Sequence, residues 1–460
     1  MSVLTSPSRI LFAMAAAVAL SSCGTASAVG AKLWPFGGDG GSSKAEKKKE
    51  SEEGRISILT FDQKLEADPA LAGRSPEVPP AMDLADWAQP GGVENNAPGN
   101  INGAADLKIA WREGGGTGSS RKEWIGAPPV VSGGKLYLFD AGQELRAFDA
   151  TSGKHLWSAS LRPKKSPDKV AVGGGVAIAD GRIYVSTGFG GLAAFDEASG
   201  KELWRSATTA PFRAAPTAGN GRVYAVTNDS ELMAIDGSTG EVLWTHQAIA
   251  EPAGILSASS PALSADMVIA PFASGEVVAL LAANGRRLWV DALTRSGRLT
   301  SLSAINDIAG RPVAADGVVY AVSHSGVLVA IDQRTGQRIW ARGIASTQTP
   351  MVAGDALYLV TTDGELAALD RNTGGAFWVK QLRRYEDEDD KKGRVTWTGP
   401  IMVGGNLVLA SSHGEAILVS PTTGEVNKTI KLGSPVFIPP IAAGGSVYLV
   451  NNEAKLMVLR

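Results

Sequence analysis

The stretch Glu144–Trp157, ELRAFDATSGKHLW, decides the fold, because copies of it recur along the chain. Each copy joins an apolar strand, a polar turn that contains glycine, and a second strand that ends in tryptophan. Successive tryptophans lie 38 to 51 residues apart. One further copy, EAILVSPTTGEVNKTI at 415–430, lacks the tryptophan, and we expect the equivalent position to lie near Thr429 or Ile430. The repeated tryptophans are Trp111, Trp157, Trp204, Trp244, Trp289, Trp340 and Trp378.

The upstream half of most copies also repeats, as in APPVVSGGKLYLF, TPMVAGDALYLV and PPIAAGGSVYLV. Proline and apolar residues lead into a glycine turn and an alternating strand, so each copy supplies four short strands. Four strands in a period of roughly 40 to 50 residues are typical of a propeller blade. The sequence therefore predicts an all-β protein, an eight-bladed β-propeller over residues 105–460 with four antiparallel strands per blade.

The two ends of the propeller sequence complement each other. Residues 446–460 supply inner strands without a final tryptophan strand, whereas the Trp111 strand lacks inner strands of its own. Pairing them closes the ring as a shared blade and removes an exposed sheet edge.

An aspartate precedes the turn in most copies and has a structural interpretation. Its side chain accepts hydrogen bonds from the backbone of its own turn, and each tryptophan offers a large face for packing between neighbouring blades. One such residue per blade, on separate turns, favours architecture over a metal or ligand site. The aspartates are Asp149, Asp196, Asp236, Asp332 and Asp370.

The N-terminus has the pattern of an exported protein. Arg9 and the apolar run ILFAMAAAVAL end in small residues, which predicts a signal peptide over 1–22. The sequence LSSC resembles a bacterial lipobox, which implies lipidation of Cys23 and stable membrane anchoring; an ordinary signal peptide with an incidental cysteine is the alternative. Residues 23–54 are expected to be a flexible tether, and 55–104 an extended segment that packs on the propeller.

Composition argues against several functions. The net charge of −2 disfavours nucleic-acid binding, and a lone cysteine permits no intramolecular disulfide. The four histidines lie in different repeats without metal-ligand spacing, and no local catalytic signature is present, so we expect neither a metal nor catalytic residues. The acidic insertion YEDEDDKK at 385–392 is expected to be a solvated interblade loop, with a weak cation or basic-partner site as the alternative.

Blades of the A-x-D-x-x-T-G-x-x-x-W kind resemble those of the quinoprotein dehydrogenases, which bind pyrroloquinoline quinone. That family uses calcium-ligating acidic residues and often a disulfide of adjacent cysteines. This chain has only Cys23 and no acidic cluster at a matching place. A quinoprotein-type periplasmic dehydrogenase, or another ligand-binding lipoprotein propeller, remains the alternative function.

The lipoprotein signal, the tether and the eight blades together resemble the BamB family, the lipoprotein subunits of the β-barrel assembly machinery. DPALAG at 68–73 and ADWAQPGG at 85–92 are similar to its alphaproteobacterial branch. The resemblance implies a non-catalytic scaffold without a cofactor, lipid-anchored at the periplasmic face of the outer membrane. It implies docking on the POTRA domains of BamA, association with other subunits, and assistance to the folding and insertion of outer-membrane β-barrel proteins, with unfolded client proteins as possible further partners.

The same resemblance assigns the BamA contact to two interblade loops. In GILSASSPAL at 254–263, Ile255 and Leu256 match, while Ser257 replaces the family's arginine. In SAINDIAGRPV at 303–313, Asp307 matches one acidic position and Ala309 replaces a second. Loops on a rigid scaffold commonly carry binding residues, and Asp307 is expected to pair with a basic residue of the partner. The alternative is that Ile255 and Leu256 simply begin a strand.

Overall fold

The structure is a computed structural model. It describes residues 65–164, 170–208, 210–251, 259–294 and 305–460, all of which lie within one unit, Asp62–Arg460. Within these ranges β-strands dominate, and the only helix is a short 3₁₀ helix, η1 (Pro69–Leu71). No helix in the described part of the chain is both long and apolar enough to span a bilayer.

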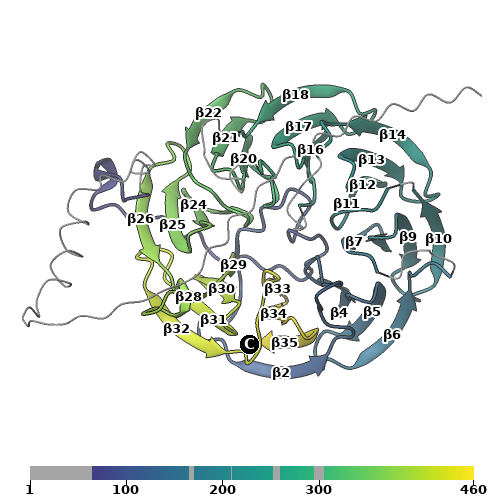
Figure 1. Cartoon of the computed structure of the whole chain (residues 1–460), viewed down its shortest axis with the longest axis horizontal. Coiled ribbons are helices and arrows are strands. Elements are labelled where there is room, and N and C mark those ends of the chain that lie inside the picture. The colour runs from purple at the N-terminus through teal and green to yellow at the C-terminus, as the bar shows by residue number, and fades with distance from the viewer. Residues whose placement is uncertain (1–64, 165–169, 209, 252–258, 295–304) are drawn as a thin grey trace, which may run out of the picture. The chain divides into compact units, whose positions relative to one another are not determined.

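Most of the described strands form eight blades of four antiparallel strands each, arranged around a ring (Figure 1). The blades are numbered in their order along the chain, and the strands of each blade are given from the innermost to the outermost. Blade 1 contains β3 (Val130–Ser132), β4 (Lys135–Phe139), β5 (Glu144–Asp149) and β6 (His155–Ser160); blade 2, β7 (Gly174–Ala179), β8 (Arg182–Thr187), β9 (Gly191–Asp196) and β10 (Glu202–Ala207); blade 3, β11 (Thr217–Gly219), β12 (Arg222–Val226), β13 (Glu231–Asp236) and β14 (Val242–Gln247); blade 4, β15 (Ala262–Ser264), β16 (Met267–Pro271), β17 (Glu276–Leu281) and β18 (Arg287–Ala292).

The remaining blades follow the same order, and blade 7 gains a short parallel strand, β1 (Asn100–Ile101). Blade 5 contains β19 (Val313–Ala315), β20 (Val318–Val322), β21 (Leu328–Asp332) and β22 (Arg338–Arg342); blade 6, β23 (Met351–Ala353), β24 (Ala356–Val360), β25 (Glu365–Asp370) and β26 (Ala376–Gln381); blade 7, β29 (Trp397–Val403), β30 (Asn406–Ser411), β31 (Glu415–Val419) and β32 (Val426–Lys431); blade 8, β33 (Ile441–Ala443), β34 (Ser446–Val450), β35 (Lys455–Leu459) and β2 (Ile109–Gly114).

Blade 8 closes the ring, as the sequence predicted. Its outer strand β2 comes from the start of the propeller and pairs antiparallel with the C-terminal strand β35, with Trp111 opposite Val458. In Figure 1 the blue β2 lies beside the yellow β35. The prediction of an eight-bladed propeller, with seven continuous blades and one shared between the two ends, is confirmed.

Alternation along the inner strands explains how the blades stack. In β13, Leu232 and Ala234 pack in one apolar cluster with residues of blade 4. The next residues along, Met233 and Ile235, pack in the cluster shared with blade 2. Because side chains of a strand point alternately to its two faces, a strand that is apolar throughout fills the space on both sides of its blade.

The position of the missing tryptophan in blade 7 was predicted near Thr429 or Ile430, and in the structure it is the residue just before Thr429. In blade 3, Trp244 follows Gly240 by four residues and pairs with Ala234 just before a bulge. The equivalent residue of blade 7 is Lys428, which pairs with Leu418 just before the matching bulge. Thr429 and Ile430 are the next two positions. The Lys428 ammonium bonds Asp106, just ahead of β2, so an ion pair links blades 7 and 8 where other blades use an indole.

Residues 65–104, here called the N-terminal segment, cross the ring and bond to every blade (Figure 1). Trp87 forms an antiparallel bridge with Val131 of β3, and Gln89 bonds the backbone of both β7 and β11. The contacts on blades 1 to 8 in turn are Trp87–Val131, Ala88–Ile178, Gln89–Ala218, Glu94–Leu263, Asn95–Ala314, Asp68–Ala376, Ile101–Gly404 and Leu84–Gly444.

The innermost strand of a blade has a free edge, whose backbone groups would otherwise be unpaired. Bonds to the N-terminal segment give several of these edges a partner. Asp86 also accepts a bond from Gly133, in the turn that follows β3. The N-terminal segment thus lies on the face of the ring that carries the turns after the innermost strands. The loops that lead from one blade into the next lie on the opposite face, at the start of those strands.

Candidate functional sites

The tryptophans of the repeat join each blade to the next. The indole N–H of Trp244 donates to the carbonyl of Ala282 in blade 4 at 3.1 Å. Its ring lies so close to Gly285 that a Cβ there would come within 2.6 Å, and Gly285 has a φ of +71°. The indole N–H also donates to a backbone carbonyl of the next blade in Trp204, Trp289, Trp340 and Trp378. The rings of Trp111 and Trp157 pack against Gly153 and Gly200, respectively.

The repeated aspartates organise the turns beside these glycines. Asp236 Oδ1 accepts bonds from the Ser238 hydroxyl and from the backbone N–H groups of Ser238 and Thr239. These bonds favour the charged form and lower the pKa of Asp236 to about 2. Asp149, Asp196 and Asp332 bond their own turns in the same way, which lowers their pKa values too; Asp370 accepts from the backbone of Asn372 and Thr373.

A pH-dependent loss of stability follows for the Asp236→Asn variant. The folded pKa lies below the ordinary value of 3.8, so the carboxylate stabilises the fold above about pH 4, and this contribution disappears as the pH falls towards 2. We expect the variant to be less stable than wild type at neutral pH and the gap to narrow through that window. Urea unfolding at a series of pH values measures it. Asp229→Asn, at an exposed position in the turn after β12, is the control; a gap independent of pH contradicts the prediction.

Asp307 lies inside the protein and pairs within the chain. Both its carboxylate oxygens accept bonds from Arg213 Nη2, at 2.8 and 2.7 Å. The Asp307 side chain is 0% exposed and that of Arg213 is 10% exposed. Arg213 belongs to the loop entering blade 3 and Asp307 to the loop entering blade 5, so the ion pair connects two interblade loops. The carboxylate that is expected to pair with a basic residue of a partner therefore also has a guanidinium partner within this chain.

Three other predicted site residues, Cys23, Ile255 and Leu256, lie outside the described residues. Ser259 and Ser260, which follow the Ile255 loop, are buried. Ser259 Oγ bonds the carbonyl of Gly310, three residues beyond Asp307. The described end of the first loop is therefore bonded directly to the second loop, although their residues are some 50 positions apart in the sequence.

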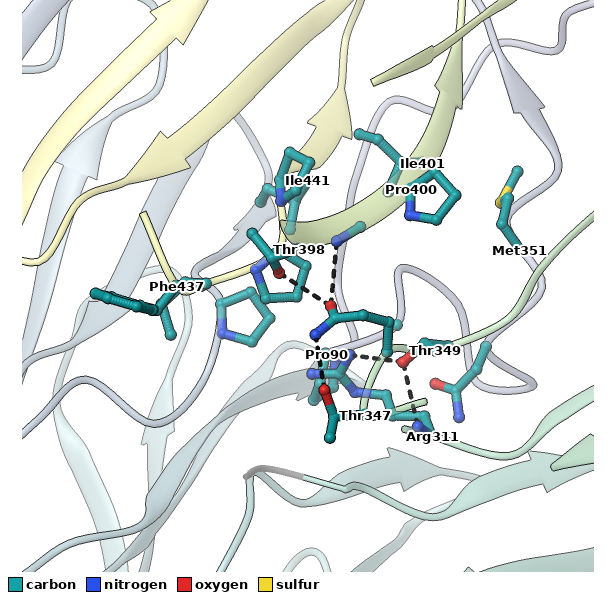
Figure 2. Close-up of a pocket in the computed structure, with 18 of the residues that line it drawn as sticks. Pro90, Arg311, Thr347, Thr349, Met351, Thr398, Pro400, Ile401, Phe437 and Ile441 are labelled. Carbon is teal, nitrogen blue, oxygen red and sulfur yellow. Dashed lines mark hydrogen bonds between the residues drawn. The ribbon is translucent and has the colours of Figure 1, made fainter. Parts of the chain in front are cut away.

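A cavity of about 210 Å³ lies in the centre of the ring. The N-terminal segment lines one part of it with Trp87, Pro90 and Pro98. The loops entering blades 1, 5, 6 and 8 line the rest, together with the first residues of β23, β29 and β33, and prolines and isoleucines are prominent among them. In Figure 2, Arg311, Thr347 and Thr349 lie together, with Thr398, Ile401 and Ile441 above them in the view.

Arg311, which was not among the site residues predicted from the sequence, lines this cavity and is 5% exposed. A signal was present in the repeat. The residue before the proline that leads into an innermost strand is small or lacks charge in the other copies, such as Ala215, Ser260, Thr349 and Gly399, whereas blade 5 has arginine. A charged residue at a position that the fold buries is a mark of a site.

The cofactor of the quinoprotein dehydrogenases does not fit these residues. Its calcium requires a set of acidic oxygen ligands. Within the described ranges there is no group of three or more His, Cys, Asp or Glu side chains placed to hold a metal ion. The single cysteine in the sequence also rules out a disulfide of adjacent cysteines.

The acidic insertion forms a small exposed hairpin, β27 (Tyr385–Asp387) and β28 (Lys392–Arg394), between blades 6 and 7. Its charges are largely satisfied within the hairpin and its surroundings: Glu388 accepts from two backbone N–H groups, and Lys392 pairs with Asp390. This arrangement fits a solvated connection.

A family model described as outer membrane protein assembly factor BamB matches residues 104–167 and 141–380 of this chain. The BamB protein of Escherichia coli strain K12 is 26% identical over 332 residues, which are 71% of this chain and 82% of that protein. The BamB protein of Moranella endobia strain PCIT is 24% identical over 216 residues, 44% of this chain; the match spans about half of that relative, 51% of its length.

Solved structures share the fold at lower identity. The crystal structure of BamB from Moraxella catarrhalis has a TM-score of 0.65 and 18% identity, and covers 77% of this chain and 100% of that chain. Quinohemoprotein alcohol dehydrogenase from Comamonas testosteroni has a TM-score of 0.64 and 15% identity, with 82% and 81% covered. At such identities these similarities show the fold alone.

Proposed function

This chain belongs to the family of outer membrane protein assembly factor BamB, and from that premise we propose that it is a non-catalytic scaffold of the outer-membrane β-barrel assembly machinery. It docks on the POTRA domains of BamA and assists the folding and insertion of β-barrel proteins. The observation that carries the proposal is the family match, which spans nearly all of blades 1 to 6.

We place the BamA contact on the interblade loops entering blades 4 and 5. Ile255 and Leu256 are the apolar anchors of this proposal, since a few well-packed, desolvated residues carry most of the binding energy of an interface. Asp307 contributes by its ion pair with Arg213, which supports the loop entering blade 5.

A pull-down of the lipoprotein from outer membranes in mild detergent tests the docking. We expect BamA in the eluate of wild type and at least a tenfold loss for Leu256→Asp, because a carboxylate replaces an apolar anchor; tenfold corresponds to about 1.4 kcal/mol. Ile339→Asp is the matched control, since Ile339 is an exposed apolar residue on the outer strand of blade 5. Absence of BamA from the wild-type eluate contradicts the proposed function, and equal recovery with both variants contradicts the loop assignment.

Membrane attachment is a separate part of the proposal. We propose that residues 1–22 are removed, that Cys23 is lipidated, and that residues 23–54 tether the propeller to the periplasmic face of the outer membrane. Several acyl chains bind a bilayer stably, at about 0.8 kcal/mol for each buried CH₂.

We expect Cys23→Ala, exported with a cleavable signal, to move from the membrane to the soluble periplasmic fraction. Fractionation followed by immunoblotting measures this release. Because BamA by itself is able to retain the protein, the Cys23→Ala and Leu256→Asp double variant is compared alongside. Membrane association of the double variant equal to that of wild type argues against the lipid anchor.

A further inference from the structure

The central cavity has a chemistry that docking on a protein partner does not require. It lies between the N-terminal segment and the loops entering the blades, and its walls are rich in proline, with Ile125, Ile401 and Ile441 among the apolar side chains. Its volume of about 210 Å³ is below the roughly 300–1,000 Å³ typical of pockets for drug-sized ligands. The cavity therefore suits a small molecule.

Three side chains that line the cavity carry buried polar atoms without a hydrogen-bond partner among the described residues. They are the indole N–H of Trp87, Nε of Arg311 and Oδ1 of Asn96. Seven side-chain atoms of this kind occur in the described part of the chain, and three of the seven belong to this cavity. Buried polar groups are ordinarily paired. Because each of these atoms is fully buried in the structure, a ligand in the cavity satisfies them only when the wall shifts to expose them.

Arg311 indicates that such a ligand carries a negative charge. Apart from its backbone, its only hydrogen bond in the described structure joins Nη1 to the Thr349 hydroxyl at 3.5 Å, and no described carboxylate forms an ion pair with it. Burial lowers the pKa of Arg311 to about 10, so it still carries its charge at neutral pH. Arg213, by contrast, is balanced by Asp307 at 2.7 Å. A buried cation without an anion is strongly unfavourable.

We propose that the central cavity binds a small organic acid whose carboxylate receives hydrogen bonds from Arg311 and Trp87 and whose apolar body packs against the proline and isoleucine walls. A planar guanidinium matches a carboxylate, and one guanidinium balances a single negative charge. This inference is independent of the proposed docking on BamA.

Isothermal titration calorimetry on the mature full-length lipoprotein in mild detergent tests the site. The probes are benzoate and phenylacetate, each compared with its neutral amide, benzamide and phenylacetamide. We expect at least one acid to bind wild type and its amide to bind at least tenfold more weakly, because the amide has no charge for Arg311 to balance. Binding by neither acid, or equal binding of acid and amide, overturns the proposal.

Variants then test which side chains donate hydrogen bonds to the bound acid. Arg311→Met keeps much of the side-chain volume and removes the charge, and we expect it to weaken acid binding at least tenfold. Arg222→Met is the matched control, because Arg222 also has a buried Nε without a partner but lies outside the cavity lining; its affinity for the acid should equal that of wild type. Undiminished binding by folded Arg311→Met overturns the assignment. If Arg311→Met does not fold, acid binding by Trp87→Phe and the comparison of acid with amide on wild type test the proposal in its place.

Discussion

A chain that ends before β35, truncated after Ala454, is expected to lose the folded propeller. Residues Leu456, Met457, Val458 and Leu459 are all 0% exposed. Burying one such side chain contributes about 1.5–3 kcal/mol, so the four together contribute roughly 6–12 kcal/mol, close to the 5–15 kcal/mol of stability of typical domains. Loss of β35 also leaves β2 and β34 as open edges. We expect loss of the cooperative transition in guanidinium unfolding, and aggregation in size-exclusion chromatography.

The control for this truncation removes a similar number of residues from the periphery. Replacing residues 385–392 of the β27–β28 hairpin with a short glycine–serine linker takes away residues that are exposed, apart from the half-buried Tyr385, and that belong to none of the blades. That variant should unfold cooperatively with a midpoint near that of wild type. If the chain without β35 remains monomeric with an unchanged midpoint, closure through blade 8 is not needed for stability.

The second large effect is expected for Asp307→Ala, with a loss of about 3–5 kcal/mol in the free energy of unfolding. Removing one partner of a buried ion pair typically costs that amount; here Arg213 is 10% exposed and loses both bonds to Asp307. Denaturant unfolding at neutral pH measures it. Glu202→Ala removes the partner of Arg205 from an exposed pair on the outer strand of blade 2, and it should cost less than about 1 kcal/mol.

The double variant Arg213→Met and Asp307→Leu separates stability from docking. It removes both charges and keeps apolar volume, so most of the lost stability should return. If the folded double variant still recovers BamA, Asp307 serves docking only by supporting its loop. If the double variant is stable and does not recover BamA, the pair itself contributes to the contact. A cost for Asp307→Ala no larger than that for Glu202→Ala contradicts the importance of the buried pair.

Local pattern was sufficient to predict the blades but not every position in them. The turn, the glycine and the tryptophan of each copy lie within about 15 residues, as in 231–244, so their structural roles follow from short-range geometry. Blade 7 shows the limit: without tryptophan as a marker, the equivalent position was predicted only as near Thr429 or Ile430, and it is Lys428. Counting four residues from Gly424, as from Gly240 to Trp244, leads to Lys428.

The sequence by itself determined the fold class, the number of blades and the closure between β2 and β35, because each depends on a repeated pattern and on what the two ends lack. Only the tertiary structure decided that Asp307 pairs with Arg213, 94 residues away, that residues 65–104 bond to all eight blades, and that Arg311 lies buried in the central cavity without an anionic partner among the described residues. The physical reason is ring closure. It brings interblade loops from distant parts of the chain to one axis, and no local periodicity records which of their side chains meet there.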